Sequence, residues 1–134
     1  MPSSKPSPLL APLVAALLLA PVAEASAATP RTAALQVALT GLHLYRGSID
    51  GIAGPATRRA VRRLQRRRHL AVDGVAGPRT RRALGWRGRP DLGRRQLRRG
   101  RRGWDVSELQ FLLRRRGFSP GSIDGGFGRA TRSA

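Results

Sequence analysis

One short motif, Asp-Gly-x-x-Gly-x-x-Thr, occurs three times in this chain and constrains its fold more than any other feature. The three copies begin at Asp50, Asp73 and Asp124. Around the motif, residues 47–51 (GSIDG) recur unchanged as residues 121–125. Repetition of this kind indicates copies of one small structural unit. In each copy Asp and Gly favour a turn, because Asp bonds backbone N–H groups and Gly adopts a positive φ.

Apolar residues outside these turns follow helical spacing. Leu35, Ala38, Leu39 and Leu42 have the i, i+3, i+4, i+7 pattern of one helical face. The predicted helices of the first unit cover residues 32–44, 55–68 and 78–84, and Val106, Leu109 and Leu113 mark the matching first helix of the second unit. The sequence therefore predicts an all-α fold, a small three-helix bundle repeat with Asp-Gly loops.

The repeat predicts a division of the chain into four parts. We expect a signal peptide at residues 1–27, a complete unit at 30–86, a flexible Arg/Gly-rich linker at 87–103 and a truncated second unit at 104–134. The second unit ends soon after Thr131, which aligns with Thr57 near the start of the second helix. We therefore expect the chain to be a fragment or a shortened product, with residues 104–134 poorly ordered in isolation.

The N-terminus resembles a secretory signal. Lys5 precedes an apolar run at residues 9–20, and Ala25-Ser26-Ala27 has the small-x-small form of a cleavage site. The run is shorter than the roughly 20 apolar residues of a transmembrane helix. We therefore expect an exported protein, with no transmembrane span.

The formal net charge of +19 predicts attraction to polyanions. Every basic residue except Lys5 is Arg, so a GC-rich genome could equally account for a solvated arginine surface. Both explanations of the charge stay open at this point.

There is no Cys, which excludes disulfides and thiolate metal sites.

No residue pattern predicts catalysis, a cofactor or a metal site. His43 and His69 lack the spacing of metal ligands, and no His stands where it could activate Ser48 or Ser122. The Asp residues of the repeated motif are better explained as turn residues than as general acids. We therefore expect a binding protein rather than an enzyme.

The repeated pattern resembles the bacterial peptidoglycan-binding domain of the three-helix type. The residues of the first copy that carry the resemblance are Leu35-Gln36, Gly47, Asp50-Gly51, Gly54, Thr57, Val61, Leu64-Gln65, Asp73-Gly74, Gly77, Thr80 and Leu84. Ala53 and Ala76 stand where many members have an aromatic residue, which occurs here only as Phe127 in the second copy. If this aromatic seats glycan, the first unit binds more weakly.

The resemblance implies non-covalent binding of cell-wall peptidoglycan, by a module that targets an exported wall hydrolase or similar enzyme. Candidate binding residues are Tyr45, Asp50, Thr57, Arg58, Arg62, Asp73, Thr80 and Arg81. Arginine suits the carboxylates of muramyl peptides, and Tyr45 could either stack on a sugar or close the core. The expected partner is peptidoglycan, through its glycan or its stem peptide, and the expected state is a monomer.

Two other functions remain open from the sequence. The chain could bind polyanions by charge alone, such as anionic wall polymers or nucleic acid, although aromatic residues to stack on bases make up only 4% of it. Binding of that kind weakens steeply with salt. It could also be a regulatory, prodomain-like module that folds over a neighbouring hydrolase.

Overall fold

The computed structural model describes residues 27–134, and this part of the chain is all-α, as the sequence predicts. The predicted signal peptide lies almost entirely outside the described residues. The elements are α1 (Pro30–Gly41), α2 (Pro55–Arg67), α3 (Pro78–Ala83), the 3₁₀ helix η1 (Gly85–Gly88), α4 (Trp104–Arg115) and α5 (Arg129–Ser133). None of these helices is long and apolar enough to cross a membrane.

Proline starts the three helices of the first unit. Pro30, Pro55 and Pro78 occupy the first turn of α1, α2 and α3, where the missing N–H has no intrahelical partner to lose. In α1 the Thr29 side chain also accepts a hydrogen bond from the Thr32 amide, 3.1 Å away. The observed bounds therefore agree with the predicted helices, except that α1 begins and ends earlier.

Histidine ends two of these helices. His43 and His69 have φ angles of 57° and 53°, in the left-handed region that stops a helix. The following amides fold back, Leu44 N onto Leu39 O and Leu70 N onto Gln65 O, each at 2.9 Å. Gly117, with φ of 86°, ends α4 in the same way. The two histidines are thus helix terminators, and this turn is why α1 ends before the predicted residue 44.

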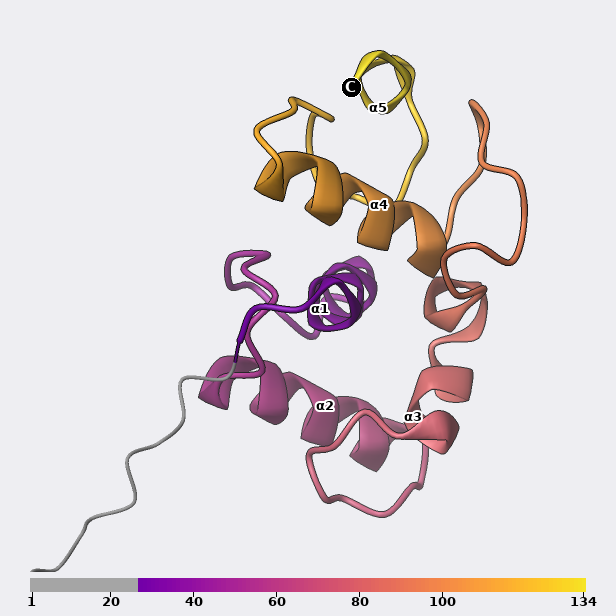
Figure 1. The fold of residues 1–134 in the computed structure, drawn as a ribbon. Helices are drawn as coiled ribbons and strands as arrows, with labels where there is room; N and C mark the ends of the chain where they lie inside the picture. Colours follow the sequence, from indigo (N-terminus) through magenta and orange to yellow (C-terminus); the bar gives the residue numbers. More distant parts are fainter. Residues whose placement is uncertain (1–26) are drawn as a thin grey trace, which may run out of the picture.

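Helix α1 is the centre of the fold and lies between α2 and α4 (Figure 1). One face of α1 packs against α2, and together they form the main hydrophobic core. The buried residues of this core are Ala34, Leu35, Ala38, Leu39, Leu44, Tyr45, Ala60, Val61, Leu64, Leu84 and Trp104. Trp104 comes from the second unit, so the two units share one core.

The second unit also covers the opposite face of α1. Phe111 of α4 and Ile123 pack on Ala33, and Phe111 is only 5% exposed. Gly51, with φ of 74°, makes this contact possible, because a Cβ there would lie 2.6 Å from the Phe111 ring. The second unit therefore does not stand alone in the whole chain: its first helix is buried against the first unit.

The far face of α4 is only partly covered, by the short helix α5 (Figure 1). Leu109 and Leu113 are half-buried and Phe118 is 51% exposed. The equivalent residues of α1, which include Leu35 and Leu39, are buried under α2. The apolar face of α4 is therefore more exposed than the matching face of α1.

Residues 87–103, where we expected a flexible linker, make specific contacts with α3 and α4. Asp91 pairs with Arg81 at 2.6 Å, and the Leu92 amide donates to the Glu108 carboxylate at 3.0 Å. Arg95 binds Asp105 with two hydrogen bonds, of 2.7 and 3.0 Å. Composition could not predict these contacts, because they depend on which three carboxylates meet this Arg-rich segment in the fold.

The two phenylalanines of the second unit allow a matched test of this docking. We expect Phe111→Ala to lower the free energy of unfolding by about 3 kcal/mol, because it empties a buried site between α1 and α4. Phe118→Ala makes the same chemical change at an exposed site and should cost less than about 1 kcal/mol. Equilibrium urea unfolding measures both, and equal losses would show that α4 is not docked on α1.

Candidate functional site

A buried glutamine holds the first Asp-Gly loop against α1. Gln36 is completely buried, and its Nε2 donates to Asp50 Oδ1 at 2.7 Å, Thr57 Oγ1 at 3.1 Å and Ile52 O at 3.1 Å. Its Oε1 accepts from the Gly51 amide at 2.9 Å. One side chain therefore joins helix α1, the loop and the first turn of α2. We call this arrangement a glutamine hub.

The same hub occurs at each of the other two motifs. Gln65 contacts Asp73, Gly74, Val75 and Thr80, and Gln110 contacts Asp124, Gly125, Gly126 and Thr131, all through hydrogen bonds of 2.7 to 3.1 Å. Sequence reasoning treated these glutamines only as motif positions. The signal was present, since a Leu-Gln pair stands before each motif.

The hubs explain most of the chemistry of the motif residues. Asp50 and Asp73 each use Oδ1 to accept from their glutamine and from the amide two residues on, at 2.8 Å. Thr57 and Thr80 are buried and bond both the glutamine and a loop carbonyl. These hydrogen bonds are the turn roles expected from the sequence, and a direct ligand contact by any of the four residues stays a prediction.

Tyr45 closes the core beneath the first loop. Its side chain is buried, and its hydroxyl donates to Ser48 O at 2.8 Å while accepting from Gln36 at 3.3 Å. The chain passes so close to it that a Cβ on Gly47 would lie 2.5 Å from the hydroxyl. The sequence left open whether Tyr45 stacks on a sugar or closes the core, and the structure places its side chain in the core.

Two of the candidate arginines line a groove between α1, α2 and the second Asp-Gly loop. This groove, which we call the α1–α2 groove, has a volume of about 370 Å³. Arg58 and Arg62 lie along it with Asp73 and Thr57, over a floor that includes Val61. The groove therefore brings four of the eight candidate residues together on one side of the first unit.

Arg81 has a different environment. Its guanidinium bonds Asp91 and Gly88 O at 2.6 and 3.0 Å and stacks 4.2 Å from the ring centre of Trp104. It lines a smaller hollow, of about 160 Å³, that shares Thr32 with the α1–α2 groove. Arg81 is therefore engaged by intramolecular partners and fixes α3 to the second unit.

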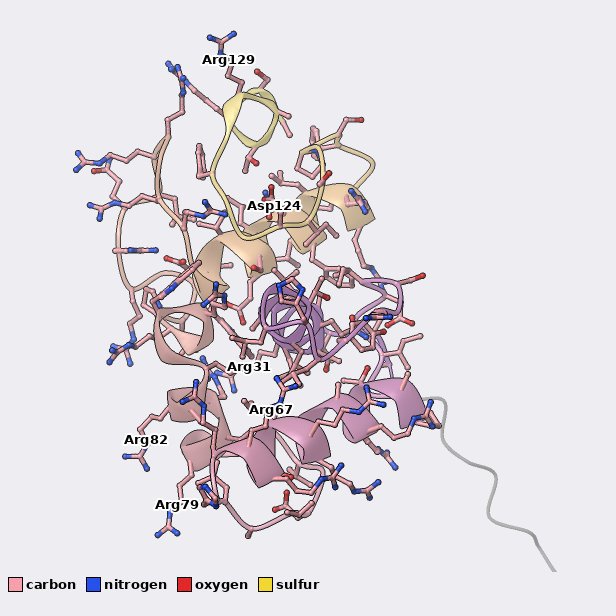
Figure 2. All side chains as sticks on the ribbon, turned by 180° about the vertical axis from the view of Figure 1, so that it is seen from behind. Arg31, Arg67, Arg79, Arg82, Asp124 and Arg129 are labelled. Atoms are coloured by element: carbon pink, nitrogen blue, oxygen red, sulfur yellow. The ribbon has the colours of Figure 1, made fainter. Side chains whose placement is uncertain are left out.

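Most other arginines project from the surface. Figure 2 shows the side chains of Arg79, Arg82 and Arg129 extending away from the ribbon. Within residues 27–134 only two ion pairs form, those of Arg81 and Arg95. The described part of the chain also contains no cluster of His, Cys, Asp and Glu that could hold a metal ion. The surface is thus a set of largely unpaired cations.

The family comparison bears on this same first unit. Residues 29–84 match the model of the family described as "Putative peptidoglycan binding domain". Residues 29–84 are a domain of this family. The α1–α2 groove and two of the three glutamine hubs lie within this peptidoglycan-binding domain. Searches of curated proteins and of solved structures found no match to the chain.

Replacing a hub glutamine tests its structural role. Gln65→Met keeps the size of the side chain but leaves the Gly74 amide and the Asp73 and Thr80 oxygens without their partner. We expect a loss of about 3 kcal/mol in the free energy of unfolding, because buried polar groups without hydrogen bonds are costly. Gln96→Met, at an exposed position, should change it by less than about 0.5 kcal/mol. Urea unfolding of both variants measures the difference.

Two aspartates give the domain an acid-sensitive stability. The Val75 amide and the Gln65 side chain lower the pKa of Asp73, and Arg81 lowers the pKa of Asp91. A carboxyl whose pKa is lower in the folded than in the unfolded state stabilises the fold at pH values above its unfolded-state pKa. This contribution is lost as the pH falls through its folded-state pKa. The melting temperature should therefore decrease once the pH is below about 4, the ordinary pKa of an Asp side chain.

The Asp91→Asn variant tests the source of this loss. It removes one titrating group, so its melting temperature should fall less than that of the unchanged protein between about pH 5 and about pH 2. Circular dichroism melts at each pH measure this, and parallel curves for the two proteins would contradict the assignment.

Proposed function

We propose that this protein binds peptidoglycan without catalysing a reaction, and that the α1–α2 groove is the binding site. The observation that carries the proposal is the position of this groove, within the family-matched residues, with Arg58 and Arg62 beside an apolar floor. Muramyl peptides offer carboxylates to guanidinium groups and apolar sugar faces and methyl groups to such a floor. Neither arginine has a carboxylate within ion-pairing distance among the described residues.

The proposal includes an envelope location. The predicted signal peptide at residues 1–27 and the peptidoglycan-binding domain both support export to the cell wall. In this interpretation the chain concentrates an attached or neighbouring wall enzyme on its insoluble substrate, and the glutamine hubs keep the binding loops rigid. A prodomain-like role over a hydrolase uses the same surfaces and would appear as inhibition of that enzyme.

The surplus of unpaired arginines supports a second candidate function. A net charge of +19 with only two ion pairs in residues 27–134 favours anionic wall polymers, held by charge alone. The two functions differ in their response to salt, because screening weakens a purely electrostatic interaction much more than recognition in a groove.

A sedimentation assay separates them. The full chain is mixed with insoluble peptidoglycan stripped of anionic polymers, at low salt and at about 0.5 M salt, where the Debye length is only a few ångströms. Retention at both concentrations supports recognition of peptidoglycan. Loss at high salt would mean that charge alone held the protein on the wall.

A matched pair of variants tests the groove itself. Arg58→Gln with Arg62→Gln should weaken retention at high salt by about tenfold or more, because charge-assisted hydrogen bonds are lost. Arg59→Gln with Arg66→Gln removes the same charge from exposed positions of α2 outside the groove and should leave retention nearly unchanged. Equal effects of the two pairs would overturn the assignment of the groove.

A further inference from the structure

A second pocket lies where the two units meet. It has a volume of about 210 Å³ and is formed by α1, η1, residues 102–103 and the third Asp-Gly loop. Val37 and Gly41 of α1 line it, together with Asp124 of the third Asp-Gly loop. Because Ser107, Asp124 and Gly125 of the second unit complete the lining, the pocket exists only when α4 is docked on α1. The lining residues from Trp86 onward lie beyond the family match, which ends at residue 84.

Trp86 gives this pocket an aromatic wall. It is 48% exposed, whereas Trp104, the other tryptophan, is 2% exposed and belongs to the core. The guanidinium of Arg87 lies 4.5 Å from the centre of the Trp86 ring, and that of Arg102 lies 6.0 Å from it. A half-exposed indole next to two cations favours a ligand that has both an apolar face and a negatively charged group.

The cations of the pocket contact the Trp86 ring but no carboxylate among the described residues. Neither Arg87 nor Arg102 forms an ion pair within the described part of the chain. Asp124 uses Oδ1 for the Gln110 side chain and the Gly126 amide, while Oδ2 bonds no described residue. Figure 2 places Asp124 on the loop that lies over α4. The pocket thus offers two cationic donors and a carboxylate acceptor.

We propose that this pocket binds one pyranose ring that carries a carboxylate. The sugar face packs on Trp86 and the apolar lining, its carboxylate bonds the guanidinium groups of Arg87 and Arg102, and its hydroxyl or amide N–H groups donate to Asp124 Oδ2. The volume is below the range of drug-sized sites, which suits a single ring rather than an extended strand. The source of the sugar, the cell wall, rests on the proposed function. The chemistry of the sugar rests on the residues that line the pocket.

Two wall components share this chemistry. Muramic acid of the glycan strand carries a lactyl carboxylate, which is free where the stem peptide has been removed, and uronic acids occur in anionic polymers. Either source would give the chain a second contact with the wall, separate from the α1–α2 groove. Two linked contacts raise the overall affinity without strengthening either one.

Tryptophan fluorescence tests the pocket directly, because Trp86 is exposed and Trp104 is not. The full chain is titrated with N-acetylmuramic acid, glucuronic acid and the neutral N-acetylglucosamine. At least one acid should change the emission saturably, and the neutral sugar should bind about tenfold more weakly, since it lacks the charge-assisted hydrogen bonds. The stronger acid identifies the source.

Matched variants make the result specific. Arg87→Gln with Arg102→Gln should weaken acid binding by about tenfold or more, measured by calorimetry as well as fluorescence. Arg98→Gln with Arg99→Gln removes the same charge from exposed positions and should leave it unchanged. Circular dichroism confirms that each variant is folded. The proposal is overturned if neither acid binds saturably, if the neutral sugar binds equally well, or if both pairs of variants behave alike.

The same proteins in the sedimentation assay separate this inference from the proposed function. Loss of wall retention with intact binding of the acidic sugar would reject the α1–α2 groove and keep the pocket. Retention that survives while no acidic sugar binds would reject the pocket and keep the groove.

Discussion

The glutamine hub is the interaction on which the rest of the structure depends. An amide side chain that both donates and accepts can satisfy a loop amide, a loop carbonyl, a carboxylate and a hydroxyl from one buried position. Gln36, Gln65 and Gln110 each do so. Small helices with few large apolar residues could not hold such loops by hydrophobic packing alone. The loops that shape the α1–α2 groove and the second pocket are therefore held in place by hydrogen bonds to the buried glutamines beneath them.

Helix α1 converts two repeated units into one folded body. One face packs on α2 and the other on α4, so a single helix serves both cores (Figure 1). Trp104 inserts into the first core, and Gly51 leaves room for Phe111. On its far face the second unit has only the short helix α5, whereas its near face packs on α1 (Figure 1). This sharing is what creates a pocket between the units in addition to the groove within the first.

The arginines fall into two physical classes that composition does not distinguish. Arg81 and Arg95 are held by carboxylates and fix the connection between the units. Arg58, Arg62, Arg87 and Arg102 line hollows and form no ion pair in residues 27–134. The first class stabilises the fold, and the second is the one that we propose for an anionic ligand. A high net charge is therefore compatible with specific recognition, because only a few of the cations lie where a ligand can approach an apolar surface.

The sequence by itself determined the helices, the turns and the family of the first unit. These depend on local chemistry: apolar spacing for the helices, proline at their first turns, and Asp-Gly for the loops. Only the tertiary structure decided that Gln36 is a hub, that Tyr45 is buried, that residues 87–103 are anchored, and that Trp86 faces a pocket. Each of these depends on contacts between residues of different elements. Such contacts leave no periodic pattern: the Leu-Gln pairs mark where the glutamines stand, but only the folded chain shows which groups they bond.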